Sequence, residues 1–90
     1  MQLLHKAGAG TLESSDCCVT AAPAAQNSLE YTGANSAIFA ERTKKLVASV
    51  LAECGVEAAA VTIHDQGAIE ITIKARLETA LMRAAEKEGE

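Results

Sequence analysis

Large aromatic side chains are almost missing from this sequence, which contains no Trp, one Phe and one Tyr. Hydrophobic residues make up 49% of the chain and are therefore mostly Ala, Val, Leu and Ile. Aromatic anchors supply much of the packing energy of many cores and interfaces. We therefore expect a thin, aliphatic core, and we expect any permanent partner to bind through Leu, Ile and Ala faces.

An excess of positive charge is also missing, because 8 Lys and Arg residues stand against 12 Asp and Glu residues, a net charge of −4. Nucleic acid phosphates are bound by clustered Lys and Arg, so this balance argues against a nucleic acid partner. No apolar run reaches the roughly 20 residues of a membrane-spanning helix, and no signal-peptide pattern opens the chain. We therefore expect a cytoplasmic protein without a membrane partner.

The three cysteines, Cys17, Cys18 and Cys54, lack the Cys-x-x-Cys spacing of metal and redox motifs. A structural zinc site uses about four ligands at close spacing, and His5 and His64 do not complete one. Adjacent residues of a strand point to opposite faces, so Cys17 and Cys18 are poorly placed to act together. The simplest interpretation is three small, half-buried hydrophobic residues in a reducing compartment, with no metal site.

Hydrophobic periodicity divides the chain into six elements. It predicts strands over 17–22, 29–32, 59–64 and 69–74, and helices over 37–54 and from 75 onward. The first two strands are expected to pair as a hairpin, and residues 65–67 are interpreted as the turn of a second hairpin. The chain is therefore predicted to be α+β, a two-layer sandwich in the order ββαββα. Its sheet is expected to be mostly antiparallel, with the two helices on one face.

The second hairpin has the cleanest alternation, with Ile69, Ile71 and Ile73 on one side. That side is predicted to be buried against the helices, so Ile71→Asp is expected to lower stability by several kcal/mol.

The chain length of 90 residues suits one small domain. Residues 1–15 contain Gly8 and Gly10 but no periodicity, and are predicted to form a flexible N-terminal leader. Residues 16–88 are predicted to form a single α+β domain, and the tail from Glu88 onward is expected to fray.

The stretch most suggestive of chemistry is GTLESSD at residues 10–16, in which Ser14 and Ser15 lie between two acids. Taken alone, such a run is far more often a turn or a helix cap, because Ser and Asp hydrogen-bond their own backbone. Glu13 and Asp16 are open to two interpretations, solvated turn acids or acids recognised by another protein.

A catalytic site within the chain is the weakest hypothesis. It would use Cys17 or His64, but no local pattern brings His64 to Ser14, and a thin two-layer domain leaves little room for a substrate cavity.

In order, GTLESSD, an extended segment, an amphipathic helix, and the segments DQGA (65–68) and ARLE (75–78) resemble the acyl carrier protein of citrate lyase. This family, also called the gamma subunit, includes the relative in citramalate lyase. The resemblance covers most of the chain and is densest at residues 10–16 and 65–81. It implies a non-catalytic carrier subunit with a covalent prosthetic group on Ser14. Ser15 is the second choice, at a position where the family commonly has Gly.

The resemblance also implies a cofactor and partners. The cofactor would be 2'-(5''-phosphoribosyl)-3'-dephospho-CoA, joined to Ser14 through a phosphodiester by a prosthetic-group transferase. Its thiol would carry acetyl and citryl groups between the alpha (acyl transferase) and beta (citryl lyase) subunits, as citrate is cleaved to acetate and oxaloacetate in citrate fermentation. Arg76 and Glu78 match the family, and are interpreted either as partner contacts or as part of a solvated helix face.

Two alternatives stay open at this point. One is a carrier for citramalate lyase. The other is a small interaction or regulatory subunit without a covalent group, in which Ser14 belongs to an ordinary turn.

Overall fold

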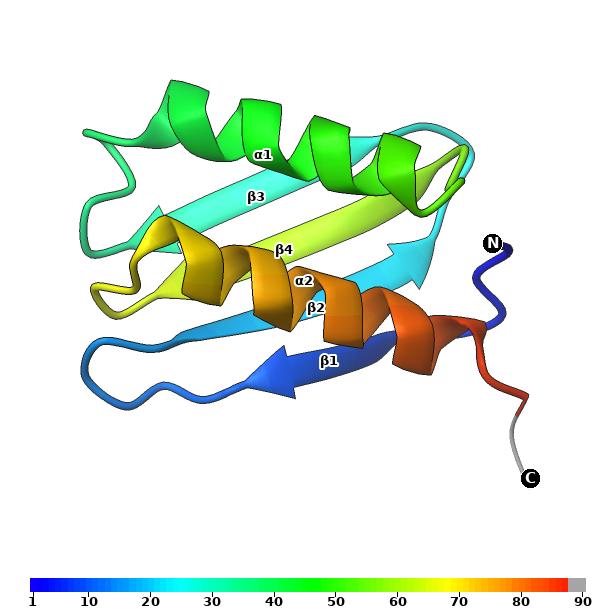
Figure 1. The fold of residues 1–90 in the computed structure, drawn as a ribbon, viewed down its shortest axis with the longest axis horizontal. Coiled ribbons are helices and arrows are strands. Elements are labelled where there is room, and N and C mark those ends of the chain that lie inside the picture. The colour runs from blue at the N-terminus through cyan, green and yellow to red at the C-terminus, as the bar shows by residue number, and fades with distance from the viewer. Residues whose placement is uncertain (88–90) are drawn as a thin grey trace.

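The computed structural model describes residues 1–87 and consists of a four-stranded sheet covered on one face by two helices (Figure 1). The elements in chain order are β1 (Ala7–Gly10), β2 (Cys17–Pro23), β3 (Ser28–Gly33), α1 (Ala40–Glu53), β4 (Ala59–Asp65) and α2 (Glu70–Ala85). The predicted α+β class, with two layers and both helices on one face of the sheet, is confirmed. The fraying predicted from Glu88 lies outside the described residues. Among the helices of residues 1–87, none is long and apolar enough to cross a membrane.

The strand order in the sheet is β1-β2-β4-β3. β2 pairs antiparallel with β1 and with β4, whereas β3 pairs parallel with β4. The hairpin predicted for segments 17–22 and 29–32 is therefore wrong, because β4 lies between them. β4 is the strand whose side chains are buried most regularly, which suits a central position, and the more polar β3 takes an edge. Because β3 and β4 are parallel, the chain returns between them through α1.

The strand predicted for residues 69–74 is also wrong, because residues 70–74 form the first turns of α2 and Ile69 is the residue just before the helix. Only Ile73 is fully buried, whereas the side chains of Ile69 and Ile71 are 67% and 69% exposed. Ile73 begins a buried stripe with helical spacing that continues through Leu77, Ala80, Leu81 and Ala84. This longer pattern outweighs the short alternation, because a helix buries its whole stripe against the sheet.

The flexible leader predicted for residues 1–15 is not free over its first ten residues. β1 forms a ladder with β2, Leu3 is 7% exposed in the core, and the amino group of Met1 donates to the carbonyl oxygen of Gly55 at 2.9 Å. The sequence AGAG of β1 has no hydrophobic alternation, so periodicity did not reveal this strand. The fourth strand thus lies at 7–10 rather than at 69–74, and the elements follow each other as βββαβα.

The core lies between the sheet and the helices and is aliphatic. Its largest fully buried side chains are Ile63, Ile73, Leu77, Leu81, Val19, Val50 and Val61. The two aromatic residues, Tyr31 and Phe39, are only half-buried at the margin.

The exposures of two isoleucines on α2 give a stability test that separates the helix from the strand expected there. Ile73→Asp should lower the free energy of unfolding by more than about 3 kcal/mol, because it buries an unpaired charge. Ile71→Asp should change it by less than about 1 kcal/mol, since an exposed acid favours the first turn of a helix. Urea unfolding of the two variants measures both values, and equal losses would contradict this orientation of α2.

Candidate functional site

Ser14 is exposed in the loop that joins β1 to β2, at one end of the sheet (Figure 1). Residues 13–16 form a β-turn, closed by a hydrogen bond of 3.1 Å from the Asp16 N–H to the carbonyl oxygen of Glu13. Ser14 takes the second position of this turn. Within residues 1–87 its hydroxyl makes no hydrogen bond, so the oxygen is open to a reagent from solvent.

Ser15 takes the third position of the turn with φ +69°, in the left-handed region. A positive φ at this position alone is typical of a type II turn, which usually carries Gly or Asn there. The Ser15 N–H donates to the carbonyl oxygen of Gln66 at 2.8 Å and so fixes this residue against the next loop. The turn geometry gives a physical reason for the glycine that resemblance to the carrier family leads us to expect at this position.

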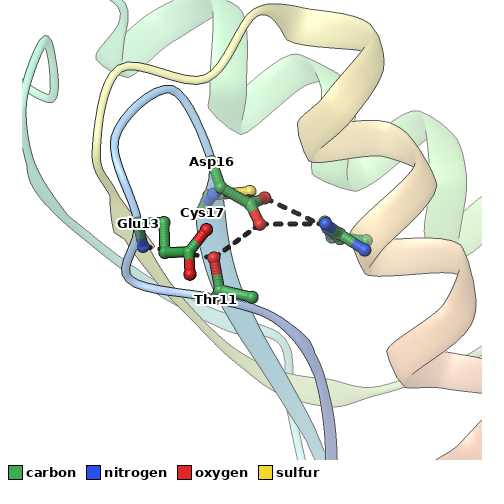
Figure 2. Close-up of polar contacts among 5 residues, drawn as sticks. Thr11, Glu13, Asp16 and Cys17 are labelled. Atoms are coloured by element: carbon green, nitrogen blue, oxygen red, sulfur yellow. Dashed lines mark hydrogen bonds and ion pairs between the residues drawn. The ribbon is translucent and has the colours of Figure 1, made fainter.

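Asp16 joins the loop to α2 (Figure 2). Its carboxylate accepts hydrogen bonds from Arg76 Nε at 3.1 Å and Nη2 at 2.9 Å, from Thr11 Oγ1 at 2.8 Å and from the Cys17 N–H at 2.7 Å. The guanidinium, then the Thr11 hydroxyl and the Cys17 amide, hold the pKa of the Asp16 carboxyl well below its usual range. The same contact raises the pKa of Arg76. Asp16 is therefore not a solvated turn acid, and Arg76 is engaged within its own chain.

Backbone contacts hold the rest of the loop in place. The Thr11 N–H donates a hydrogen bond to the carbonyl oxygen of Cys17 at 3.2 Å. The Gln66 N–H donates one to the carbonyl oxygen of Asp16 at 2.9 Å. Gly10 has φ +97°, and a Cβ at this position would overlap the carbonyl oxygen of Cys17. Only glycine fits there. Ser14 thus stands on a turn held on both sides rather than on a free leader.

Asp65, predicted to belong to a hairpin turn, instead ends β4 and organises the loop before α2. Its fully buried carboxylate accepts hydrogen bonds from the Tyr31 hydroxyl at 2.7 Å and from the Gly67 and Ala68 N–H groups at 2.8 Å each. Burial and this hydrogen bond raise the pKa of Tyr31. Sequence reasoning missed this role. The available signal was a strand ending in Asp before Gly, because a buried carboxylate at such a point can accept the next amide protons.

The residues considered for catalysis are not brought to the serine. Cys17 is fully buried, and burial, followed by the charges of two nearby acids, raises the pKa of its thiol to about 11. Such a thiol stays protonated at neutral pH and is a poor nucleophile. His64 is exposed, and its Nδ1 lies 3.0 Å from Thr32 Oγ1 rather than near Ser14. Residues 1–87 also contain no group of three or more His, Cys, Asp or Glu placed to hold a metal ion.

The left-handed backbone of Ser15 predicts a gain in stability from glycine. Ser15→Gly should raise the free energy of unfolding by up to about 1 kcal/mol, because it relieves an unfavourable φ that costs an L-residue roughly 1–2 kcal/mol. Ser14→Gly is the matched control, since Ser14 has no positive φ to relieve, and should lower stability slightly. Urea unfolding compares the two, and a loss in Ser15→Gly would contradict the turn geometry.

The Asp16 contacts predict a pH dependence of stability. A carboxyl whose pKa is lowered by folding stabilises the protein above its unfolded pKa of about 3.9, and this contribution is lost as the pH falls toward the folded value. Asp16→Asn should therefore be less stable than the wild type near neutral pH, and the difference should narrow below about pH 4. Urea midpoints of both proteins at two pH values measure this, and a difference that stays constant would refute it.

Comparison with known proteins gives the family of the chain. Residues 4–84 match the acyl carrier family described as "Malonate decarboxylase delta subunit (MdcD)". The chain is 44% identical to the citrate lyase acyl carrier protein of Treponema denticola, over 97% of this chain and 100% of the relative. It is 38% identical to the protein of the same name from Haemophilus ducreyi, over 97% and 92% of the two chains. No solved structure matches. The chain therefore belongs to the family of citrate lyase acyl carrier proteins.

Proposed function

We propose that this protein is the acyl carrier subunit of citrate lyase and that its prosthetic group is attached to Ser14. The names of its relatives support the carrier role. The observation that carries the choice of site is the exposed Ser14 hydroxyl, which stands on a fixed turn without an internal hydrogen bond. The chain offers this hydroxyl for loading and contributes no catalytic residue of its own.

The surroundings of Ser14 fit a covalent arm that extends into solvent. A hollow of about 560 Å³ lies at the opposite end of the sheet, beside Leu3 and Val56, and one of about 190 Å³ lies between β3 and α1. Residues 10–16 line neither of them. The phosphoribosyl dephospho-CoA group supplies a thiol that carries the acyl group as a thioester. On an open turn, that thiol is free to reach the active sites of other subunits, and the tether keeps its local concentration high.

Ser14 is favoured over Ser15 by the geometry of the turn. The Ser15 N–H donates a hydrogen bond to the carbonyl oxygen of Gln66, which holds the Ser15 backbone against the neighbouring loop. Ser14 lies one residue before this contact. The Ser15 hydroxyl is also the one that relatives with glycine at this position would lack. We therefore propose that Ser15 shapes the turn and that Ser14 is modified.

The proposed partners are the alpha and beta subunits of citrate lyase and the transferase that attaches the group. The family description names a malonate decarboxylase subunit, so a carrier for that decarboxylase is the second candidate. The relatives reported above carry the citrate lyase name, which favours citrate over citramalate or malonate. Reconstitution distinguishes these candidates, because a carrier for citrate lyase restores citrate cleavage when it is mixed with that enzyme's alpha and beta subunits.

Intact-mass spectrometry tests the attachment site. Co-expressed with its attaching enzymes, the wild-type chain should gain a single dephospho-CoA-derived adduct, because the proposal has one serine modified. Ser14→Ala should abolish the adduct, and the matched control Ser15→Ala should retain it. An adduct that survives Ser14→Ala would move the site elsewhere, and a wild-type chain that stays unmodified would favour a non-carrier subunit.

A further inference from the structure

Large aliphatic side chains that do not belong to the core are exposed at the end of the molecule that carries the Ser14 turn. Leu12, in the same loop, is 65% exposed, and Ile69 and Ile71, at the start of α2, are 67% and 69% exposed. Two backbone hydrogen bonds of 2.8 and 2.9 Å join the loop of Leu12 to the loop that leads into α2. Both loops lie at the same end of the molecule (Figure 1). We call Leu12, Ile69 and Ile71 the aliphatic rim.

The rim is a concentration of apolar surface rather than a random scatter. Residues 1–87 contain seven exposed large hydrophobic side chains, and the rim accounts for three of them. A fourth, Ile38, lies at the same end, just before α1. Single exposed hydrophobic residues are normal, whereas several at one end of a small domain, the end that carries the proposed attachment serine, indicate a contact surface. Folding does not require these side chains, because the core uses only Ile73 of the three alternating isoleucines.

The loop contacts determine what must cover the rim. Asp16 is held by Arg76, and Ser14 lies only two residues before it. Even if the hydrogen bond from the Ser15 N–H to Gln66 broke, Ser14 would stay within about 7 Å of Asp16, which is the span of two extended residues. An enzyme that forms a bond to the Ser14 oxygen must therefore approach the body of the domain and contact the side chains around the turn.

Charge indicates the chemistry of that enzyme. Glu13 is exposed, and its carboxylate makes no hydrogen bond or ion pair within residues 1–87. Three other acids at this end of the molecule already have partners. Asp16 pairs with Arg76 at 2.9 Å, Glu70 pairs with Arg42 at 3.0 Å, and the buried Asp65 accepts hydrogen bonds from its own loop and Tyr31. An enzyme that binds a phosphate-rich nucleotide donor presents cationic groups in its site. The negative charge of Glu13, next to the acceptor serine, is complementary to these cationic groups.

We propose that the aliphatic rim and Glu13 form the docking surface for the transferase that loads Ser14. The matching face of that enzyme is an apolar patch with a Lys or Arg at its edge. This inference rests on the proposed loading of Ser14 and adds the surface through which the loading enzyme recognises this chain.

Binding of the purified transferase to the full chain, without nucleotide donor and with Ser14→Ala as the background, tests the proposal. Leu12→Ser, Ile69→Ser and Ile71→Ser should each raise Kd about three- to tenfold, because each removes aliphatic surface from the contact. Met82→Ser is the matched control. Met82 is 59% exposed on the same helix, and it lies about 16 Å beyond Ile71 along the axis. It should leave Kd unchanged.

The charge component has its own measurement. Kd for the Ser14→Ala chain should rise with salt, and Glu13→Gln should weaken that dependence, because it removes the acid that faces the cationic site. Urea midpoints of all variants should match that of the background, since every substituted side chain is exposed.

The outcomes distinguish a failure of the proposed docking surface from a failure of the proposed attachment site. Rim variants that bind as tightly as Met82→Ser would overturn the docking surface even if Ser14 is loaded. A Ser14→Ala chain that still gains the adduct would overturn the attachment site instead. Sedimentation that shows rim variants dissociating a dimer, with Kd for the transferase unchanged, would assign the rim to a second copy of this chain and overturn the proposal.

Discussion

The contact between Asp16 and Arg76 determines how this domain presents its serine. The two residues are 60 positions apart in sequence, one directly before β2 and the other on α2. Their side chains are 15% and 40% exposed, so water screens the pair and its contribution to global stability is modest. Its main effect is geometric, because a two-point contact between planar groups fixes the direction in which the turn leaves the sheet. Stability therefore comes from the aliphatic core, and orientation comes from this pair.

A second carboxylate completes the arrangement from the other side. Asp65 is buried where β4 ends and gathers the Tyr31 hydroxyl and two amide protons of the following loop. That loop then bonds to the turn through Gln66. The serine is thus connected to the core through a hydrogen-bonded loop as well as through α2. With the polypeptide held at both sides, the reach of the proposed carrier would come from the proposed covalent arm rather than from a mobile leader.

The sequence predicted much of this fold, and its errors have physical causes. The periodicity of 37–54 and 59–64 corresponds to α1 and β4, because both bury one regular face. β1 was missed because its small residues carry no apolar signal. The partner of Arg76 was missed because the contact is long-range, and pattern rules describe neighbours within one element. Ser14 was singled out through resemblance to a family, since its local sequence is that of an ordinary turn.

The remaining error, at residues 69–74, connects the fold to the proposed docking surface. Three isoleucines alternate with polar residues as they would in a strand, yet the helix buries Ile73 and leaves Ile69 and Ile71 in solvent. Packing of α2 on this sheet uses only Ile73 of the three, so polar residues at the two exposed positions would serve the fold as well. Local patterns and global folds are expected to disagree where a sequence serves contacts outside its own core. The two exposed isoleucines that contributed to the strand prediction lie at the end of the molecule that carries the Ser14 turn, where the proposed transferase would contact them.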